Sequence, residues 1–201
     1  MPDVLVPPER VDRWLQNFSA RHGEVTLAAD RDLVGTAADG STFRAVLPFG
    51  RHFEGEVSVE AFVAASLPPS AWGLLLVRKG GFAVARLEHD RMADSKVGQR
   101  HVQGRTKAGG QSQQRFARRR DNQARAAYEA AADHTARILG GAPALAVTGG
   151  DHSAVETVLG DRRLQHLRVV PPWLAVPDPR RSVLEQAVVD AASVRVEVHN
   201  A

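Results

Sequence analysis

The sequence contains no cysteine and no long apolar run, and both absences limit what the protein can be. Without cysteine among its 201 residues, the chain can form no disulfide bond, thiolate nucleophile or cysteine-ligated zinc site. No apolar stretch approaches the roughly 18 residues of a membrane-spanning helix, and Pro7 and Pro8 interrupt the N-terminal region before an apolar signal segment can form. We therefore expect a soluble, cytoplasmic protein that uses histidine, carboxylate, amide, hydroxyl or backbone groups and does not bind a membrane.

The positive charge of the chain is concentrated in one segment. The net charge of the whole chain is +3, but residues 96–125 contain nine basic residues and one acidic residue, a net charge of +8. The other 171 residues therefore sum to −5. A solvated helix face is one explanation, but with so few compensating acids the distribution favours an element that binds a polyanion, nucleic acid above all.

The chain is expected to fold into two domains, residues 1–69 and residues 70–201, divided at Pro68-Pro69. Apolar residues make up 43% of the sequence, as in an ordinary folded protein. In the first domain the periodicity predicts a small α+β module. Its expected elements are a helix near residues 11–18, strands at 24–29, 32–37 and 42–49, and a helix at 57–67.

The second domain is expected to have an α/β fold, an RNase H-like mixed sheet with flanking helices. Two apolar runs joined at Gly80-Gly81 predict a β-hairpin, and a more polar third strand is placed at residues 98–106. A long helix from about Ser112 to Leu139 follows. The remaining pattern predicts strands at 144–149, 164–170 and 194–199 and helices at 151–159 and about 180–192, with 173–176 as strand or loop.

The long helix has two chemically different sides. On a helical wheel, one side holds apolar and small residues, and the opposite side holds arginines within an arc of roughly 120°. The first set is Ala117, Ala124, Ala127, Tyr128, Ala131, Thr135 and Ile138; the second is Arg115, Arg118, Arg119 and Arg125. We expect the helix to pack by the first side and to offer guanidinium groups on the second.

Directly before this helix lies the loop Gly109-Gly110-Gln111. Adjacent glycines suit a loop whose backbone must approach another surface closely. A neutral amide such as that of Gln111 can orient a water or a substrate oxygen, but it cannot abstract a proton at neutral pH. The tripeptide alone would favour a simple turn before a helix.

A longer pattern gives the loop a specific interpretation. Twelve residues contain Gly109, Gly110, Gln111, Ser112, Arg115, Phe116, Ala117, Arg118 and Arg120. These positions resemble the catalytic loop and following helix of the eukaryotic and archaeal class I translation termination factors. Residues 71–201 resemble the middle domain of that family. In size and N-terminal extension the chain is most similar to the Vms1-like release-factor domain, a ribosome-rescue peptidyl-tRNA hydrolase group with bacterial members.

The resemblance implies a mechanism and two partners, the large ribosomal subunit and peptidyl-tRNA. In such proteins the loop enters the peptidyl transferase centre, and the glutamine helps to coordinate the water that attacks the peptidyl-tRNA ester. By this resemblance Gln111 is catalytic, and Gly109 and Gly110 shape the loop. Phosphates of ribosomal RNA and tRNA would be bound by basic residues, some assigned on charge alone. They are Lys107, Arg115, Arg118, Arg119, Arg120 and Arg125. No cofactor, metal or DNA partner is expected.

The length of the chain also shapes this expectation. Stop-codon reading and recruitment of a GTPase each require a further domain, and 201 residues leave no room for both. We therefore expect codon-independent release in ribosome-associated quality control, with residues 1–69 as an accessory module. Some relatives cut the tRNA near its CCA end instead of the ester, and a non-catalytic RNA-binding role is a further alternative.

Other motifs carry weaker functional signals. Glu88, His89, Asp90 and Asp94 could hold a divalent metal in a nuclease, but strand alternation separates neighbouring side chains, and a solvated strand end is favoured. The turn Gly149-Gly150-Asp151 lacks the lysine and hydroxyl of a phosphate loop, and is interpreted as a tight turn capped by Asp151. The other histidines show no ligand spacing. The tryptophans are expected in the core; they are Trp14, Trp72 and Trp173.

Overall fold

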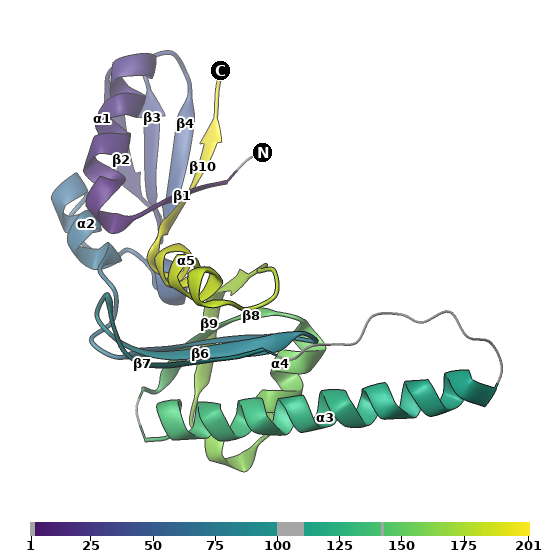
Figure 1. The fold of residues 1–201 in the computed structure, drawn as a ribbon. Helices are drawn as coiled ribbons and strands as arrows, with labels where there is room; N and C mark the ends of the chain where they lie inside the picture. Colours follow the sequence, from purple (N-terminus) through teal and green to yellow (C-terminus); the bar gives the residue numbers. More distant parts are fainter. Residues whose placement is uncertain (1–2, 100–110, 142) are drawn as a thin grey trace. The chain divides into compact units, whose positions relative to one another are not determined.

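The protein forms two compact units, each with its own five-stranded sheet, in a computed structural model that describes residues 3–99, 111–141 and 143–201 (Figure 1). The first unit comprises Met1–Pro69 together with Val188–Ala201, and the second comprises Ser70–Ala187. In the described residues, no helix is both long and apolar enough to cross a membrane. The fold is therefore mixed α/β, as the sequence predicts.

The first unit is an antiparallel sheet with helices packed on one face. The order of its strands is β1-β10-β4-β3-β2. Its elements are β1 (Val4–Val6), α1 (Val11–His22), β2 (Val25–Ala29), β3 (Leu33–Ala37), β4 (Thr42–Val46), α2 (Val59–Ser66) and β10 (Val194–His199). Helix α1 begins at Val11, and it ends before Gly23, whose φ is +92°. The predicted helices and strands of residues 1–69 are thus confirmed, with shifted ends.

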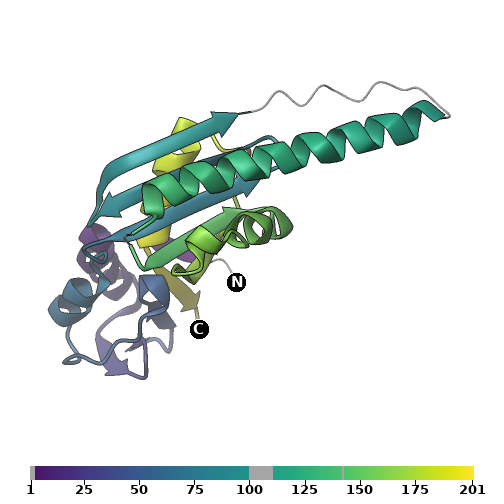
Figure 2. The ribbon, with the colours of Figure 1, turned by 90° about the horizontal axis from the view of Figure 1, so that it is seen from below.

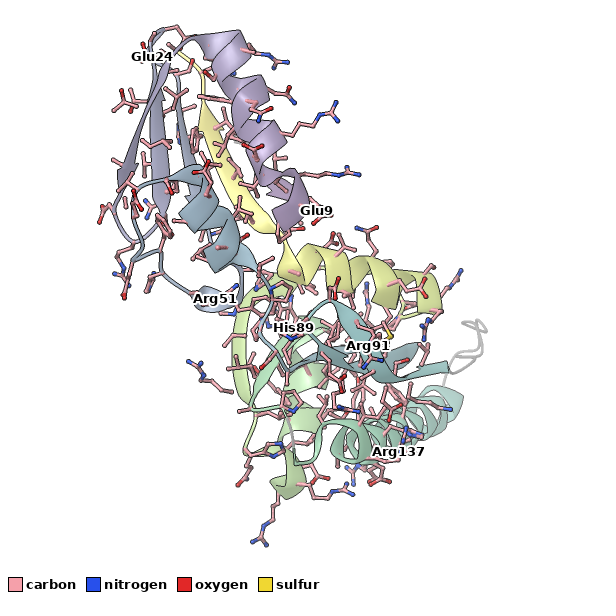
Figure 3. The ribbon with its side chains drawn as sticks, turned by 90° about the vertical axis from the view of Figure 1, so that its left-hand side faces the viewer. Glu9, Glu24, Arg51, His89, Arg91 and Arg137 are labelled. Atoms are coloured by element: carbon pink, nitrogen blue, oxygen red, sulfur yellow. The ribbon has the colours of Figure 1, made fainter. Side chains whose placement is uncertain are left out.

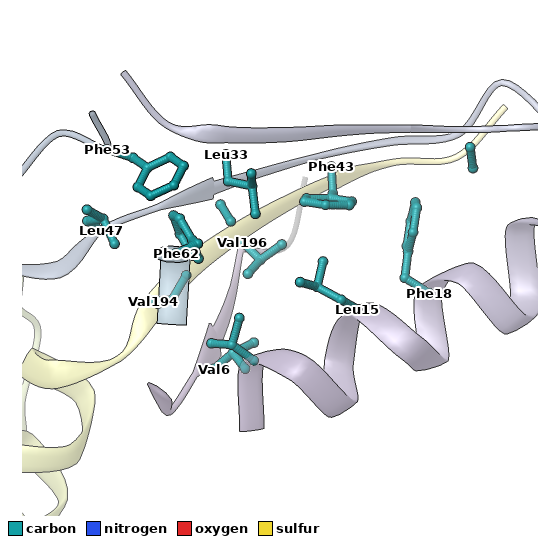
Figure 4. Packing of buried hydrophobic residues seen from close by; sticks show 13 residues of the cluster. Val6, Leu15, Phe18, Leu33, Phe43, Leu47, Phe53, Phe62, Val194 and Val196 are labelled. Atoms are coloured by element: carbon teal, nitrogen blue, oxygen red, sulfur yellow. The ribbon is translucent and has the colours of Figure 1, made fainter. Parts of the chain in front are cut away.

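Aromatic side chains hold this core together (Figure 4). Phe18 of α1 lies edge-on to Phe43 of β4, with ring centroids 5.1 Å apart. Phe62 of α2 lies edge-on to Phe53 at 5.2 Å. All four rings are buried, and such edge-to-face pairs are favoured by the quadrupoles of the rings. The apolar side of each helix therefore faces the sheet.

The C-terminal strand belongs to the first sheet. Strand β10 pairs with β1 on one side and β4 on the other, antiparallel to both. The division predicted from the sequence, 1–69 and 70–201, puts this strand with the second domain. The alternation in residues 194–199 gives β10 one buried face, but any antiparallel sheet could accept such a strand. Its partner is set by a pairing across about 150 residues of chain.

The second unit is built on a mixed sheet in the order β7-β6-β5-β8-β9. Strands β5, β6 and β7 form an antiparallel meander, and β8 and β9 run parallel to β5. Helices α3 and α4 cover one face, and α5 lies on the other (Figures 1 and 3). The elements are β5 (Trp72–Arg78), β6 (Gly81–Glu88), β7 (Arg91–Gln99), α3 (Gln111–Leu139), β8 (Leu145–Gly150), α4 (His152–Leu159), β9 (Arg168–Leu174) and α5 (Arg181–Ala192), whose residues from Val188 on belong to the first unit.

Both edge strands of this sheet differ from the prediction. The third strand is predicted at residues 98–106, whereas β7 spans Arg91–Gln99 and pairs with all of β6; residues 100–106 lie outside the described residues. The sequence of β7 is polar and lacks the apolar run that predicts a strand, because an edge strand can pair without one. Strand β9 starts later than expected and continues through Pro171 and Pro172. An edge strand tolerates proline, which has no N–H to donate, on the side without a neighbour.

Gly150 ends β8 in a place that has no room for a side chain. Its φ is +102°, and a Cβ there would lie 2.2 Å from the carbonyl oxygen of Val77. Gly141 has nearly the same φ, +104°, but a Cβ there would meet nothing within 4 Å. The two glycines therefore share the backbone strain of a substitution and differ in the steric clash.

We expect Gly150→Ala to destabilise the protein more than Gly141→Ala. Gly141→Ala should lower the free energy of unfolding by about 1–2 kcal/mol through backbone strain. Gly150→Ala should add about 1–3 kcal/mol through overpacking. Urea denaturation of the two variants checks this, and equal free energies of unfolding would show that β8 and β5 can separate without penalty.

Candidate functional site

Helix α3 is held to the sheet by its C-terminal half. Ala131, Ile138 and Leu139 are buried against residues of β5, β6 and α4. At the end of the helix, a Cβ on Gly73 of β5 would lie 2.9 Å from Cδ1 of Leu139, so the Leu139 side chain packs directly on the backbone of Gly73. The apolar side predicted from the sequence is confirmed for this half, where Thr135 is also buried and donates to the carbonyl of Ala131.

Ion pairs fix the same half of the helix. Arg137 lies 3.3 Å from Asp94 of β7 (Nη1 to Oδ2; Figure 3 shows Arg137). Asp133 lies 2.7 Å from Arg163 (Oδ1 to Nη2), in the short turn Arg162–Leu164 before β9. Arg163 also binds Asp161 at 2.6 Å. These side chains connect α3 to the edge strand β7 and to the turn that precedes the other edge strand, β9.

The N-terminal half of α3 extends beyond the sheet, as Figure 2 shows. Strands β5, β7, β8 and β9 end at the same side of the sheet, which we call the carboxyl edge. Helix α3 runs in the opposite direction, with Leu139 near the start of β5. Residues 111–125 therefore project past the carboxyl edge for about 20 Å, at 1.5 Å per residue. We call this part of the helix the arm.

The arm contains most of the residues that the sequence predicts as functional. Gln111 is the first residue of α3, and the predicted start near Ser112 is confirmed within one residue. Arg115, Arg118, Arg119 and Arg120 lie along the first three turns of the helix, and Arg125 is exposed. Gly109, Gly110 and Lys107 lie outside the described residues. The structure therefore brings Gln111 and the arginines together on one helix, away from its packed half.

At the carboxyl edge, Arg78 connects three segments of the second unit. Its guanidinium donates to the carbonyl of Val176 at 2.8 Å and lies 3.5 Å from Asp151. Asp151 also accepts the backbone N–H of Lys79 at 3.3 Å. Asp151 is the N-cap residue of α4, as predicted, but its side chain makes no capping hydrogen bond, because its carboxylate faces the β5–β6 turn. Burial, and then the charge of Asp151, raises the pKa of Tyr128 in α3.

At this edge lies an exposed aromatic pair that the sequence does not predict. Trp173 of β9 and His152 of α4 stack with ring centroids 3.6 Å apart and an interplanar angle of 8°. Trp173 is 36% exposed, so the expectation that it lies in the core is wrong, whereas Trp72 is fully buried. Trp14 packs at the side of the first core. The available signal was Pro171-Pro172, which marks an edge strand.

The acidic group at the β6–β7 turn is bound to arginines. Glu88 pairs with Arg86 at 3.0 Å and with Arg91, and these contacts hold its pKa below the ordinary value. Asp94 pairs with Arg137. Within the described part of the chain, no three histidine, aspartate or glutamate side chains gather as a metal site would require. These carboxylates instead stabilise the strand pair and the base of α3.

Comparison with known proteins gives a family and a related structure. Residues 70–197 match the family described as Actinobacteria/chloroflexi VLRF1 release factor. The crystal structure of the archaeal translation termination factor aRF1 is similar, with 13% sequence identity and a TM-score of 0.43. That alignment covers 94% of this chain and 63% of aRF1, so the chain spans less than two thirds of that protein. No curated protein matches the sequence.

The carboxylate that anchors Arg163 should titrate at unusually low pH. Hydrogen bonds from the side chain and backbone of Arg163 lower the pKa of Asp161 to about 2. Because this pKa lies below that of an unfolded aspartate, around 4, the interaction stabilises the folded state above pH 4 and is lost as the pH falls towards 2.

We expect Arg163→Gln to raise the pKa of Asp161 towards its ordinary value, while the backbone hydrogen bond remains. The neighbouring exposed Arg162 provides the matched control, since Arg162→Gln removes the same charge but none of these hydrogen bonds. An NMR titration of the Asp161 carboxyl carbon measures this pKa in both variants. An unchanged pKa in Arg163→Gln would contradict the assigned anchor.

Proposed function

Because the chain belongs to the Actinobacteria/chloroflexi VLRF1 release factor family, and thus to the Vms1-like release-factor domains, we propose that it is a codon-independent peptidyl-tRNA hydrolase. Membership in this family indicates a role in translation termination or ribosome rescue. The finer proposal is that the protein acts in the cytoplasm on stalled large ribosomal subunits and releases the nascent chain, as part of ribosome-associated quality control.

The main observation in support of the proposal is the position of Gln111, the last residue of the Gly-Gly-Gln motif, at the start of a projecting helix. Gln111 begins α3, and the arm extends about 20 Å from the carboxyl edge. A site inside the ribosome can be reached only by a narrow element, and a single helix is about 10–12 Å wide. The anchored half of α3 supports the arm as a rigid base.

The residues of the tip suit hydrolysis of an ester in a site made largely of RNA. Gly109 and Gly110 let the backbone approach the CCA end of the tRNA, because they have no side chains. Gln111 would orient a water through its amide and its backbone N–H. The water oxygen attacks the ester carbonyl carbon, the bond to the ribose oxygen breaks, and a proton passes to that oxygen. Gln111 thus acts by positioning, since its amide is not a base.

The basic residues of the arm would bind the RNA that surrounds the tip. In the sequence, residues 96–125 contain one acidic residue, Asp121, against nine basic ones. Guanidinium groups bind phosphates in a forked geometry, and each neutralised phosphate releases a counterion. We assign this role to Lys107, Arg115, Arg118, Arg119, Arg120 and Arg125. We also assign the second sheet to the RNase H-like class, supported by its three antiparallel strands followed by two strands parallel to the first.

The first test is a release assay with purified protein, isolated large subunits that carry peptidyl-tRNA, and no stop codon. We expect wild-type protein to release the peptide. Gln111→Ala should lower the rate by at least about tenfold, and Gly110→Ala by about 100-fold, through displacement of the attacking water. Gln113→Ala, two residues into the helix, is the matched control and should retain the rate.

The 3′ end of the freed tRNA shows which bond the protein cleaves. An intact CCA end is expected from ester hydrolysis, whereas a shortened 3′ end would show cleavage of the tRNA backbone. Equal release by wild-type protein and Gln111→Ala would overturn the catalytic assignment and leave a non-catalytic RNA-binding role.

The second test concerns the charge of the arm. Replacing Arg115, Arg118 and Arg119 with glutamine should weaken binding to large subunits and reduce the slope of log affinity against log salt by about two to three. The matched control removes three exposed arginines around α1, namely Arg10, Arg13 and Arg21. If both triple variants show the same salt slope, the arm does not bind RNA phosphates.

A further inference from the structure

The stacked pair at the carboxyl edge has the properties of a binding surface. The rings of Trp173 and His152 are nearly parallel, with centroids 3.6 Å apart. Both residues are exposed, although Trp173 is the kind of side chain that proteins usually bury. We call this pair the stacking platform. The pair is formed by two different elements, β9 and α4, so its rings are oriented by the fold of the unit.

Rigid contacts hold the platform in place. Trp173 lies opposite Thr148 in the β8–β9 register, and Thr148 is buried. His152 follows Asp151, whose N–H donates to the carbonyl of Val77 at 2.8 Å and whose carboxylate lies 3.5 Å from Arg78. The platform is thus attached to β5, β8 and β9 together. A preorganised aromatic surface loses little conformational entropy when a ligand binds.

The platform lies at the edge from which the arm projects. Tyr128, at the junction of the packed half and the arm, is close enough to Asp151 for that charge to raise its pKa. Residues 111–128 of the helix span about 25 Å. RNA that follows the arm from Gln111 to Tyr128 would therefore end near Asp151, the residue before His152.

Charged side chains of both signs lie beside the platform. The guanidinium of Arg78 lies 3.5 Å from Asp151 and 3.9 Å from Asp178, and the next residue, Lys79, is exposed. Among the described residues, the side chain of Lys79 is part of no ion pair. A flat aromatic surface with nearby cations suits a nucleotide, whose base stacks and whose phosphate is anionic. A purely apolar protein surface would not require the cations.

We propose that Trp173, stacked on His152, binds an unpaired RNA base at the carboxyl edge of the second sheet. The inference rests on the proposed function, because it takes ribosomal or transfer RNA as the source of the base. It adds a second contact, based on stacking rather than charge, at the base of the arm. This contact would fix how far the arm enters its site.

The test uses the full-length protein and two kinds of probe, a single-stranded oligoadenylate RNA and intact large ribosomal subunits. We expect oligoadenylate to quench the tryptophan fluorescence of the wild type but not that of Trp173→Phe, in which only Trp14 and Trp72 emit. An abasic chain of the same length, which retains the phosphates, should give no quenching.

Binding to large subunits gives the energetic test. Trp173→Ala should weaken the affinity by at least about fivefold, as expected for loss of one base–aromatic stack, and Trp173→Phe should restore most of it. Val169→Ala is the matched control, because Val169 is exposed on the same strand. Far-ultraviolet circular dichroism and the melting temperature confirm that each variant is folded.

Three results would overturn the proposal. They are wild-type affinity of Trp173→Ala for subunits, equal quenching by the abasic chain, and quenching by extracted ribosomal proteins but not by RNA. The proposed function fails separately, because these measurements do not involve peptide release. Gln111→Ala should lose release and keep the quenching; quenching without any release by the wild type would retain the platform and reject the hydrolase.

Discussion

The packing of Ala131, Ile138 and Leu139 against the second sheet is the contact on which the functional part of the structure depends. An isolated helix of about 12–15 residues is only marginally stable in water, and the arm is of that length. Because the same helix continues into a buried, ion-paired half, the arm propagates from turns that are already formed. Arg137 adds an ion pair to β7, at one edge of the sheet, and Asp133 adds one to the turn that precedes β9. The packed half thus supplies the formed turns from which the arm continues.

The charges of the second unit separate into two roles. Several of its described arginines are bound to carboxylates, as Arg86 and Arg91 are to Glu88, and Arg163 is to Asp161. These pairs hold turns and edges together, and the segment from 96 to 125 keeps a net charge of +8. This separation is how a chain of net charge +3 would bind a polyanion at one place, as we propose. The stacking platform would add selectivity for a base where the charge alone recognises only phosphates.

Local patterns predict local elements well in this chain. The helical period of α1 and α3 and the apolar runs of β5 and β6 are enough to predict these elements, because each pattern lies within the element's own residues. Three features depend on distant partners and were not predicted: the polar strand β7, the prolines inside β9, and the pairing of β10 with the first sheet. Trp173 was assigned to the core for the same reason, since its exposure follows from the edge position of β9. The motif at Gln111 can be recognised from the sequence because its residues follow one another in the chain.

The most direct test of the central claim is a cryo-electron microscopy structure of the protein on a large ribosomal subunit that carries peptidyl-tRNA. We expect α3 to point into the peptidyl transferase centre, with Gln111 beside the ester and the arginines of the arm along RNA phosphates. A complex in which the N-terminus of α3 lies outside that centre, with the ester out of reach of Gln111, would contradict the proposal that this helix delivers a hydrolytic tip.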